Sequence, residues 1–306
     1  MSFSFSRKIV LWLSLAGIAL FLLSACGGKA TGSVPNSTSQ TIVVVAAENF
    51  YGDIAQQVGG SHVNVQSILS DPNVDPHEYE ANTKSALAVS KAQLVIENAG
   101  GYDGWMDKLL SSSPNSSRVV IKAFDIAKVK LPDNEHVWYS IDNASTIAQA
   151  ITDSLKKLNP ASATEFDRNL QKFQAALQPV QQKIAEIKTK HANAPIGLTE
   201  TIFLYQSGPL GLNVLTPPEF QKAIAEGNDP PANAVITAEN QITKRQIKVL
   251  IFNEQTVTPI TTRLENDAKS SNIPTLPVTE TMPSSKTYQN WMLDQLNALE
   301  QALGKS

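Results

Sequence analysis

Short apolar runs alternate with amphipathic segments along most of this chain, and this alternation constrains the fold more than any other feature. Runs rich in β-branched residues, such as TIVVVAA at residues 41–47 and KVLIFN at residues 248–253, have the length and composition of buried strands. In the segments between such runs, apolar residues recur at helical spacing. Strands that alternate with helices form parallel sheets covered on both faces, so we expect an α/β protein.

The alternation occurs twice, once on each side of a long helical stretch. Residues 161–191 carry apolar side chains in helical register, and Pro179 lies inside that stretch. An interior proline costs about 3 kcal/mol and removes a backbone hydrogen bond, so we predict a kink or two abutting helices there. The proline- and glycine-rich residues 208–233 predict a long loop with one short helix.

Two α/β lobes with parallel sheets, bridged by the long helix, are therefore the predicted fold. We expect the first lobe at residues 41–160, the bridging helix at residues 161–192 and the second lobe at residues 193–306. The predicted strands are residues 41–47, 62–69, 94–96, 119–124, 196–199, 248–253 and 273–278. The predicted helices of the lobes are residues 50–58, 84–92, 105–110, 143–158, 259–268 and 288–303.

The N-terminal residues have the pattern of an export signal with a lipid-attachment site. Arg7 and Lys8 precede an apolar run of about 15 residues, shorter than the ~20 that a spanning helix needs, and LSAC at residues 23–26 follows it. We therefore predict a signal peptide at residues 1–25, lipidation of Cys26, and a flexible tether at residues 26–40. The expected location is the extracytoplasmic face of the cell membrane, in a periplasm or at the outer surface.

Composition excludes several classes of partner and site. The formal net charge is −3 and acidic and basic residues are well mixed, so no basic stripe predicts a nucleic-acid partner. Cys26 is the only cysteine, which excludes an internal disulfide and a thiolate metal site in the exported part. We expect a monomer that contacts the membrane through its lipid anchor.

Any histidine-containing metal site must draw on four histidines. His77 follows a predicted strand and His136 lies in a loop before a predicted helix, and open α/β sheets place ligands in such loops. His62, at the start of a strand, and His191, at the end of a basic helix, have ordinary structural explanations.

Two carboxylates could join the histidines, because Glu200 and Glu280 also follow predicted strands and can converge at the edges of the sheets. Glu254 follows the strand at residues 248–253 and is equally plausible on pattern alone, while Asp75 and Glu78 flank His77. A solvated surface carboxylate is the alternative for each of these acidic residues.

Five motifs together resemble the zinc/manganese family of ABC-transporter solute-binding lipoproteins, the ZnuA-like metal-binding proteins. The resemblance extends over about residues 43–303, nearly the whole exported part. It implies two α/β lobes bridged by a rigid helix, with the ion held in the cleft between them. The motifs are DPHEYE at residues 75–80, HVWY at 136–139, NP at 159–160, ETIFLY at 200–205 and YQNWM at 288–292.

The same resemblance implies four metal ligands, His77, His136, Glu200 and Glu280. Glutamate at position 200 matches manganese-type relatives, whereas zinc-specific relatives usually have histidine there; many relatives have aspartate where Glu280 stands. The sequence departs from the family's usual pattern in two places. The usual Asp-Pro after HVWY is replaced by Ser-Ile at residues 140–141, which leaves open what orients His136. No histidine-rich loop separates the two histidine ligands.

The expected cargo is a divalent transition metal, with manganese favoured over zinc. Zinc binds more tightly than manganese at most sites, but carboxylates that bind through both oxygens raise the coordination number above the four that zinc prefers. The expected partners are the permease and ATPase of a metal ABC importer.

The same residues support two other classes of function less well. A metallohydrolase is disfavoured because the sequence has no His-Glu-x-x-His motif and four protein ligands leave no position for an activated water. A lipoprotein that binds an organic solute, or an adhesin, is the other alternative, although organic-solute clefts usually present more aromatic and arginine side chains than these loops offer. We therefore expect no catalytic residues.

Overall fold

The computed structural model describes residues 41–305, apart from residues 72, 73, 75, 77 and 78. Gln40–Ser306 forms one compact unit. The predicted signal peptide, the tether, the lipidation of Cys26 and the position of His77 all lie outside the described residues.

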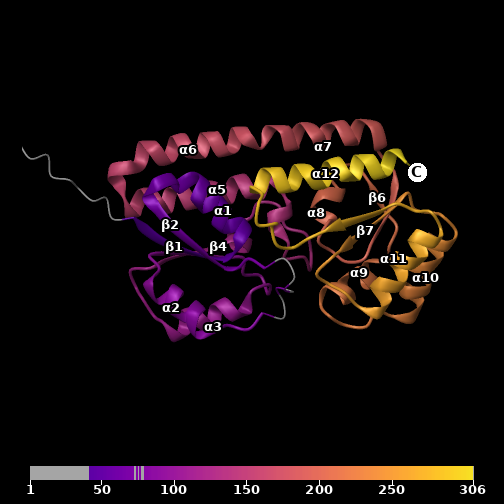
Figure 1. Ribbon diagram of the computed structural model, residues 1–306, viewed down its shortest axis with the longest axis horizontal. Coiled ribbons are helices and arrows are strands. Elements are labelled where there is room, and N and C mark those ends of the chain that lie inside the picture. The colour runs from indigo at the N-terminus through magenta and orange to yellow at the C-terminus, as the bar shows by residue number, and fades with distance from the viewer. Residues whose placement is uncertain (1–40, 72–73, 75, 77–78, 306) are drawn as a thin grey trace, which may run out of the picture. The chain divides into compact units, whose positions relative to one another are not determined.

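Two parallel four-stranded sheets form the framework, which confirms the predicted fold class (Figure 1). The first sheet has the order β2-β1-β3-β4 and the second has the order β6-β5-β7-β8, so both halves repeat one topology. The first sheet contains β1 (Ile42–Glu48), β2 (Val63–Leu69), β3 (Leu94–Glu97) and β4 (Val119–Lys122). The second contains β5 (Pro195–Leu198), β6 (Asn213–Val214), β7 (Val249–Asn253) and β8 (Thr275–Val278). We call residues 42–158 the N-terminal half and residues 195–304 the C-terminal half.

Helices cover both sheets. Those of the N-terminal half are α1 (Asn49–Gly59), α2 (Thr83–Lys91), α3 (Gly104–Ser112), α4 (Ala123–Ile126) and α5 (Ile141–Leu158). Those of the C-terminal half are α8 (Leu204–Ser207), α9 (Pro218–Ala225), α10 (Ala232–Thr243), α11 (Pro259–Ser270) and α12 (Tyr288–Gly304). Short 3-10 turns occur at Gly60–His62, Val137–Tyr139 and Pro160–Ser162.

The long helical stretch consists of two abutting helices, α6 (Ala163–Ala176) and α7 (Gln178–His191), which run end to end beside both sheets (Figure 1). The break falls at Leu177, and Pro179 occupies the first turn of α7, where a missing N–H costs no helical hydrogen bond. α6 packs on α1 and α5, while α7 packs on α12. The domain boundaries near residues 160 and 192 stay predictions, because one buried apolar cluster continues from the first sheet to the second.

Four local details differ from the sequence analysis. Residues 208–233 contain the predicted short helix, α9, but also the two-residue strand β6, and residues 232–243 form α10, which the sequence pattern did not reveal. The buried face of α10 includes alanine and glutamine side chains, which give a weak hydrophobic period, and its large apolar Ile236 is exposed. The strand predicted at residues 119–124 ends at Lys122, and His62 belongs to a 3-10 turn before β2.

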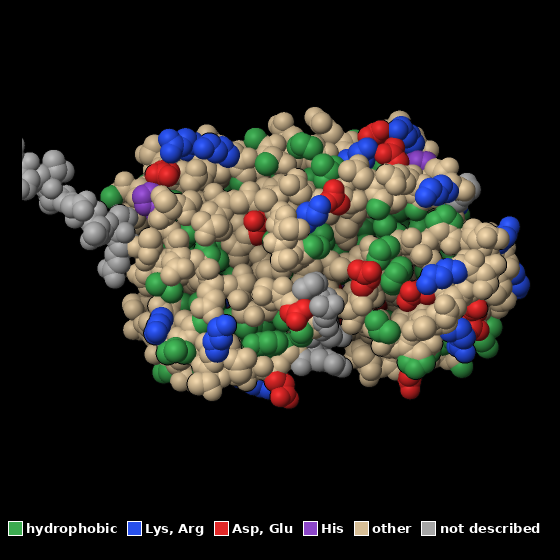
Figure 2. All heavy atoms as spheres, viewed as in Figure 1, with side chains coloured by type: hydrophobic (Ala, Val, Ile, Leu, Met, Phe, Trp, Pro, Cys, Tyr) green, Lys and Arg blue, Asp and Glu red, His purple; other side chains and the backbone are tan. Residues whose placement is uncertain are grey.

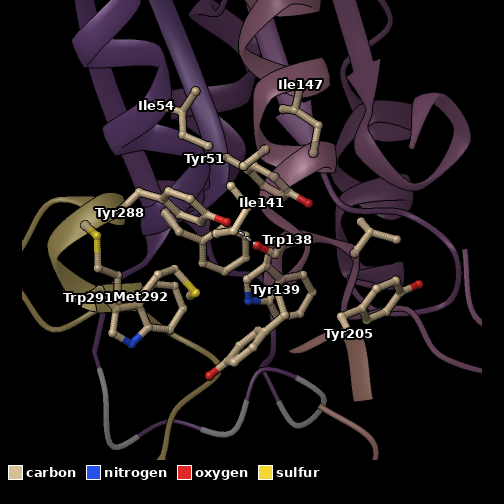
Figure 3. Packing of buried hydrophobic residues seen from close by; sticks show 14 of the residues in the cluster. Tyr51, Ile54, Trp138, Tyr139, Ile141, Ile147, Tyr205, Tyr288, Trp291 and Met292 are labelled. Atoms are coloured by element: carbon tan, nitrogen blue, oxygen red, sulfur yellow. Dashed lines mark hydrogen bonds between the residues drawn. The ribbon is translucent and has the colours of Figure 1, made fainter. Parts of the chain in front are cut away.

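An aromatic cluster occupies the centre of the core where the two halves meet. The rings of Phe50 and Trp138 are stacked with centroids 4.6 Å apart. Figure 3 shows the hydroxyl of Tyr288 directed at the main chain of Trp138, to whose carbonyl oxygen it donates a hydrogen bond of 2.6 Å. The ring of Trp138 also contacts that of His136, with centroids 5.2 Å apart. The tightly packed core therefore continues directly into a loop that carries a candidate ligand.

In the described part of the chain, no helix combines the length and the apolar composition needed to cross a bilayer. Figure 2 shows basic and acidic side chains interspersed over the visible face of the described residues.

Candidate metal site

Three candidate ligands lie together in the interior of the protein. Ligand atoms of His136, Glu200 and Glu280 all lie within 4.8 Å of one another. Their exposed fractions are 1%, 2% and 1%. Glu200 follows β5 by two residues, Glu280 follows β8 by two residues, and His136 precedes the turn Val137–Tyr139. The site therefore combines one loop of the N-terminal half with the carboxyl ends of two strands of the C-terminal half, where open α/β sheets place ligands.

Asn134 fixes the orientation of the His136 ring. Its Oδ1 lies 2.9 Å from Nδ1 of His136 and also accepts a hydrogen bond from the main-chain N–H of that residue. Its Nδ2 donates to the carbonyl oxygen of Thr201 at 2.8 Å, so the amide cannot be turned round without losing all of these bonds. Because Oδ1 only accepts, Nδ1 must carry the proton, and the lone pair of the ring lies on Nε2, toward the carboxylates.

This arrangement answers the question that the Ser-Ile pair at residues 140–141 left open. Ser140 caps α5, because its Oγ accepts the N–H of Asn143. The residue two positions before the histidine orients the ring instead. Asn134 thus holds His136 of one half and the loop beside Glu200 of the other.

Only one of the two carboxylate oxygens of Glu200 accepts a hydrogen bond from a described residue. Its Oε2 accepts the N–H of Ile202 at 2.8 Å, whereas Oε1 has no hydrogen-bond partner among the described residues. Burial, and then the negative charge of Glu280, hold the pKa of Glu200 well above its usual value of 4.5. A buried carboxylate oxygen without a donor is costly unless a proton or a cation occupies its lone pairs.

Glu280 is held by neutral donors from both halves. Asn253 Nδ2 donates to its Oε1 at 2.6 Å, and the hydroxyl of Tyr102 donates to its Oε2 at 2.8 Å. The same Oε2 lies 4.0 Å from Nε2 of His136. These bonds fix the position of the Glu280 carboxylate.

A strained loop directs Tyr102 at Glu280. Ala99, Gly100 and Gly101 have φ values of 61°, 68° and 100°, which favour glycine and are uncommon for alanine. A Cβ on Gly100 would lie 2.5 Å from the ring of Phe124. Asp103 stabilises the loop, because its carboxylate oxygens accept the N–H groups of Asn98 and Ala99, each at 2.7 Å. Strain of this kind is found at functional sites that are over-determined by their surroundings.

Other hydrogen bonds join the halves without involving a ligand side chain. The side-chain amide of Asn49, at the start of α1, donates to the carbonyl oxygen of Met282 and accepts the N–H of Met282 at 2.9 Å. The hydroxyl of Tyr139 donates to the carbonyl oxygen of Thr279 at 2.6 Å. The main chain on both sides of Glu280 is thus fixed to the N-terminal half.

The remaining candidates lie elsewhere or outside the described residues. His77, Asp75 and Glu78 belong to the part of the chain that is not described, so a ligand role for His77 stays a prediction. Glu254 is exposed, because alternation along β7 turns Asn253 inward and its neighbour outward.

The two histidines that sequence reasoning set aside have partners or positions away from the site. His62 lies 2.9 Å from Oε2 of Glu165 and 3.3 Å from Oγ of Ser162, at the start of α6. His191 is the last residue of α7.

A surface cavity adjoins the loop that carries His136. Its volume is about 510 Å³, and its lining includes Asp133, Glu135 and Glu226 together with Asn134. Lys222 also lines it and forms an ion pair of 2.7 Å with Asp133, which joins α9 to the N-terminal half. Acidic side chains around a cavity raise the local concentration of cations.

Replacing Asn134 with alanine is expected to weaken metal binding about tenfold, because His136 then loses the partner that fixes its tautomer. The protein should remain folded, and the affinity would be measured by competition with a chromophoric chelator. Asn233→Ala, at the exposed start of α10, is the matched control and should leave the affinity unchanged. An Asn134 variant with wild-type affinity would show that the ring is oriented by other contacts.

Comparison with known proteins agrees with this architecture. Residues 44–302 match the family described as "Zinc-uptake complex component A periplasmic", ZnuA. The chain is 27% identical over 250 residues to the manganese-binding lipoprotein MntA of Bacillus subtilis, covering 78% of each chain.

Two solved structures share the fold. The periplasmic zinc-binding protein TroA of Treponema pallidum has a TM-score of 0.74 and 18% identity, over 86% of this chain and 99% of that one. A Mn-bound mutant of a periplasmic metal-binding protein from Candidatus Liberibacter asiaticus has a TM-score of 0.69 and 18% identity, over 86% of this chain and 100% of that one. At this identity the likeness shows a common fold.

Proposed function

Because this chain belongs to the ZnuA family of metal-binding components of ABC importers, we propose that it captures Mn²⁺, in preference to Zn²⁺, through His77, His136, Glu200 and Glu280. The proteins of this family are solute-binding proteins and not enzymes, and their partners are a permease and an ATPase. Proteins similar to this chain include a lipoprotein and a periplasmic protein, which supports a location outside the cytoplasm. We further propose that Cys26 carries the lipid that keeps the protein at the membrane.

The observation that carries this proposal is the buried cluster of one imidazole and two carboxylates. A buried pair of carboxylates is costly, and a divalent cation would neutralise it. The oriented Nε2 of His136 and the free Oε1 of Glu200 supply lone pairs of the kind that transition metals take. The chemistry of the donor set therefore fits Mn²⁺ or Zn²⁺.

The donor set supports manganese. It includes two buried glutamates, and carboxylates that bind through both oxygens raise the coordination number above the four that zinc prefers. The name of MntA also specifies manganese, whereas that of TroA specifies zinc.

Competition titrations of the purified, lipid-free exported domain with Mn²⁺ and Zn²⁺ would test the proposal. We expect one tightly bound ion per chain, with Mn²⁺ retained after purification from medium that contains equal amounts of both metals. Nanomolar affinity for zinc together with weak retention of manganese would reverse the metal preference. Failure to bind either ion would contradict the proposed site.

A further inference from the structure

Tyr205, the last residue of the ETIFLY motif, contacts the other half of the protein through its hydroxyl group. It lies on α8 of the C-terminal half and is 3% exposed. Its hydroxyl donates to the carbonyl oxygen of Asn134 at 2.9 Å and accepts the main-chain N–H of Leu131 at 3.1 Å. Figure 3 shows this hydroxyl directed away from the rings of Trp138 and Tyr139. The ring of Tyr205 thus packs in the core, while its polar end holds a segment of the N-terminal half.

The segment that Tyr205 holds is a tight turn. Leu131 and Asn134 form an isolated antiparallel bridge, and Asp133 between them has a φ of 48°. That backbone conformation is uncommon for residues other than glycine, although aspartate and asparagine adopt it more readily than most. It costs free energy and persists where the surroundings stabilise it. Because the hydroxyl of Tyr205 bonds both ends of the turn, it supplies such stabilisation.

The turn leads directly to the imidazole ligand. Its last residue, Asn134, has its Oδ1 2.9 Å from Nδ1 of His136. The Nδ2 of Asn134 donates to the carbonyl oxygen of Thr201, the residue after Glu200. The segment of the C-terminal half that carries one ligand therefore holds Asn134 at two points, at its side chain through Thr201 and at its main chain through Tyr205.

We propose that Tyr205 is a positioning residue, which fixes the place of Asn134 and thereby the orientation and the tautomer of the His136 ring. This inference rests on the proposed function. Without the hydroxyl, the turn can relax and carry the Asn134 amide away from Nδ1 of the imidazole. The tautomer with its proton on Nε2 then becomes populated, and it offers no lone pair to a cation on the side of the carboxylates.

Tyr205→Phe tests the inference, because it removes one oxygen atom and keeps the ring that packs in the core. The dissociation constant for Mn²⁺ should rise about tenfold, as is typical when a contact that orients a ligand is lost. Thr152→Val is the matched control, since the buried hydroxyl of Thr152 also donates to a main-chain carbonyl oxygen, that of Ala148 within α5. Its affinity should equal that of the wild type. Cooperative thermal unfolding would show that each variant is folded.

A double-mutant cycle provides a readout that a merely structural role would not move. If Tyr205 acts through Asn134, Tyr205→Phe should cause no further loss of Mn²⁺ affinity in the Asn134→Ala protein, so the two losses should not add.

NMR of the metal-free protein provides a second readout, because the ¹⁵N chemical shifts of an imidazole ring distinguish its two neutral tautomers. The signals of His136 would be assigned by their absence in His136→Ala. They should move toward the Nε2-protonated tautomer in Tyr205→Phe and keep their wild-type positions in Thr152→Val.

The outcomes separate the inference from the function on which it rests. A wild-type protein that binds neither Mn²⁺ nor Zn²⁺ contradicts the proposed function. A wild type that binds, with Tyr205→Phe within about twofold of its affinity, overturns the inference and leaves the function standing. Additive losses in the double variant, or a wild-type tautomer in Tyr205→Phe, overturn it as well, since the effect would then not pass through Asn134 and His136.

Discussion

His136→Ala is expected to bind Mn²⁺ and Zn²⁺ at least about 1000-fold more weakly than the wild-type protein, because loss of a direct ligand costs more than the 10- to 100-fold typical of an outer contact. His136 supplies the only imidazole in the described cluster. Its alanine variant leaves two buried carboxylates to share any cation. Isothermal titration of the metal-free variant with each ion would measure the loss.

The control for this experiment is His62→Ala. His62 is also partly buried and hydrogen-bonded, to Glu165 and Ser162, but it lies in the turn before β2, beside the start of α6, and its loss should leave metal binding unchanged. Glu200→Gln tests the same site without creating a cavity in the core, since the glutamine side chain has nearly the shape of glutamate. If His136→Ala kept wild-type affinity while His62→Ala lost it, the site would have to be relocated.

Metal affinity is expected to fall about tenfold for each pH unit below the raised pKa of Glu200, and so about 100-fold over two units. Burial and the charge of Glu280 raise that pKa well above 4.5, so at any pH below the raised pKa the cation must displace a proton. His136 must also be neutral in order to bind, which adds to the same trend. Titrations between pH 5 and pH 8 would measure the slope.

The pH dependence of thermal stability should also report the titration of Glu200. The metal-free protein should lose stability as pH rises, whereas the stabilisation by bound metal should increase. A folded pKa raised above the unfolded value stabilises the metal-free protein fully below pH 4.5, and this contribution is lost as pH rises through the raised pKa. The metal-bound form requires the deprotonated carboxylate, so the increase in unfolding temperature caused by metal should grow with pH. An increase that is independent of pH would contradict the assignment of Glu200 as a ligand.

Glu48 provides the control for this linkage. It is fully buried, neither of its oxygens has a hydrogen-bond partner among the described residues, and burial followed by the charges of Asp103 and Glu97 raises its pKa. Glu48 is absent from the ligand cluster. Glu48→Gln should therefore flatten the pH dependence of the metal-free protein's stability while leaving the slope of metal affinity intact.

Helices and strands could be predicted from the sequence wherever apolar side chains recur at helical spacing or form a continuous run. Buried strands such as β1 and β7 are nearly continuous apolar runs, and Pro179 predicted the break between α6 and α7. β6 has two residues, too few for any period, and α10 buries small and polar side chains. Both were missed because their burial depends on tertiary neighbours.

The candidate ligands were predictable because acidic and histidine side chains at strand ends are few, and the motifs around them were informative. The residues that position these ligands could not be predicted. Asn134 and Asn253 are amides whose importance depends on which group each one meets, and those groups lie far away in the sequence. Tyr102 reaches Glu280 through the left-handed loop before it, and the pair of glycines at residues 100–101 was the one local signal for that turn.

The amide of Asn49 bonds the main chain of Met282 in the manner of a neighbouring strand, through groups that belong to no candidate ligand. Bonds of this kind stabilise the assembled receptor independently of the ion, so less of the ion's binding free energy is needed to assemble the site.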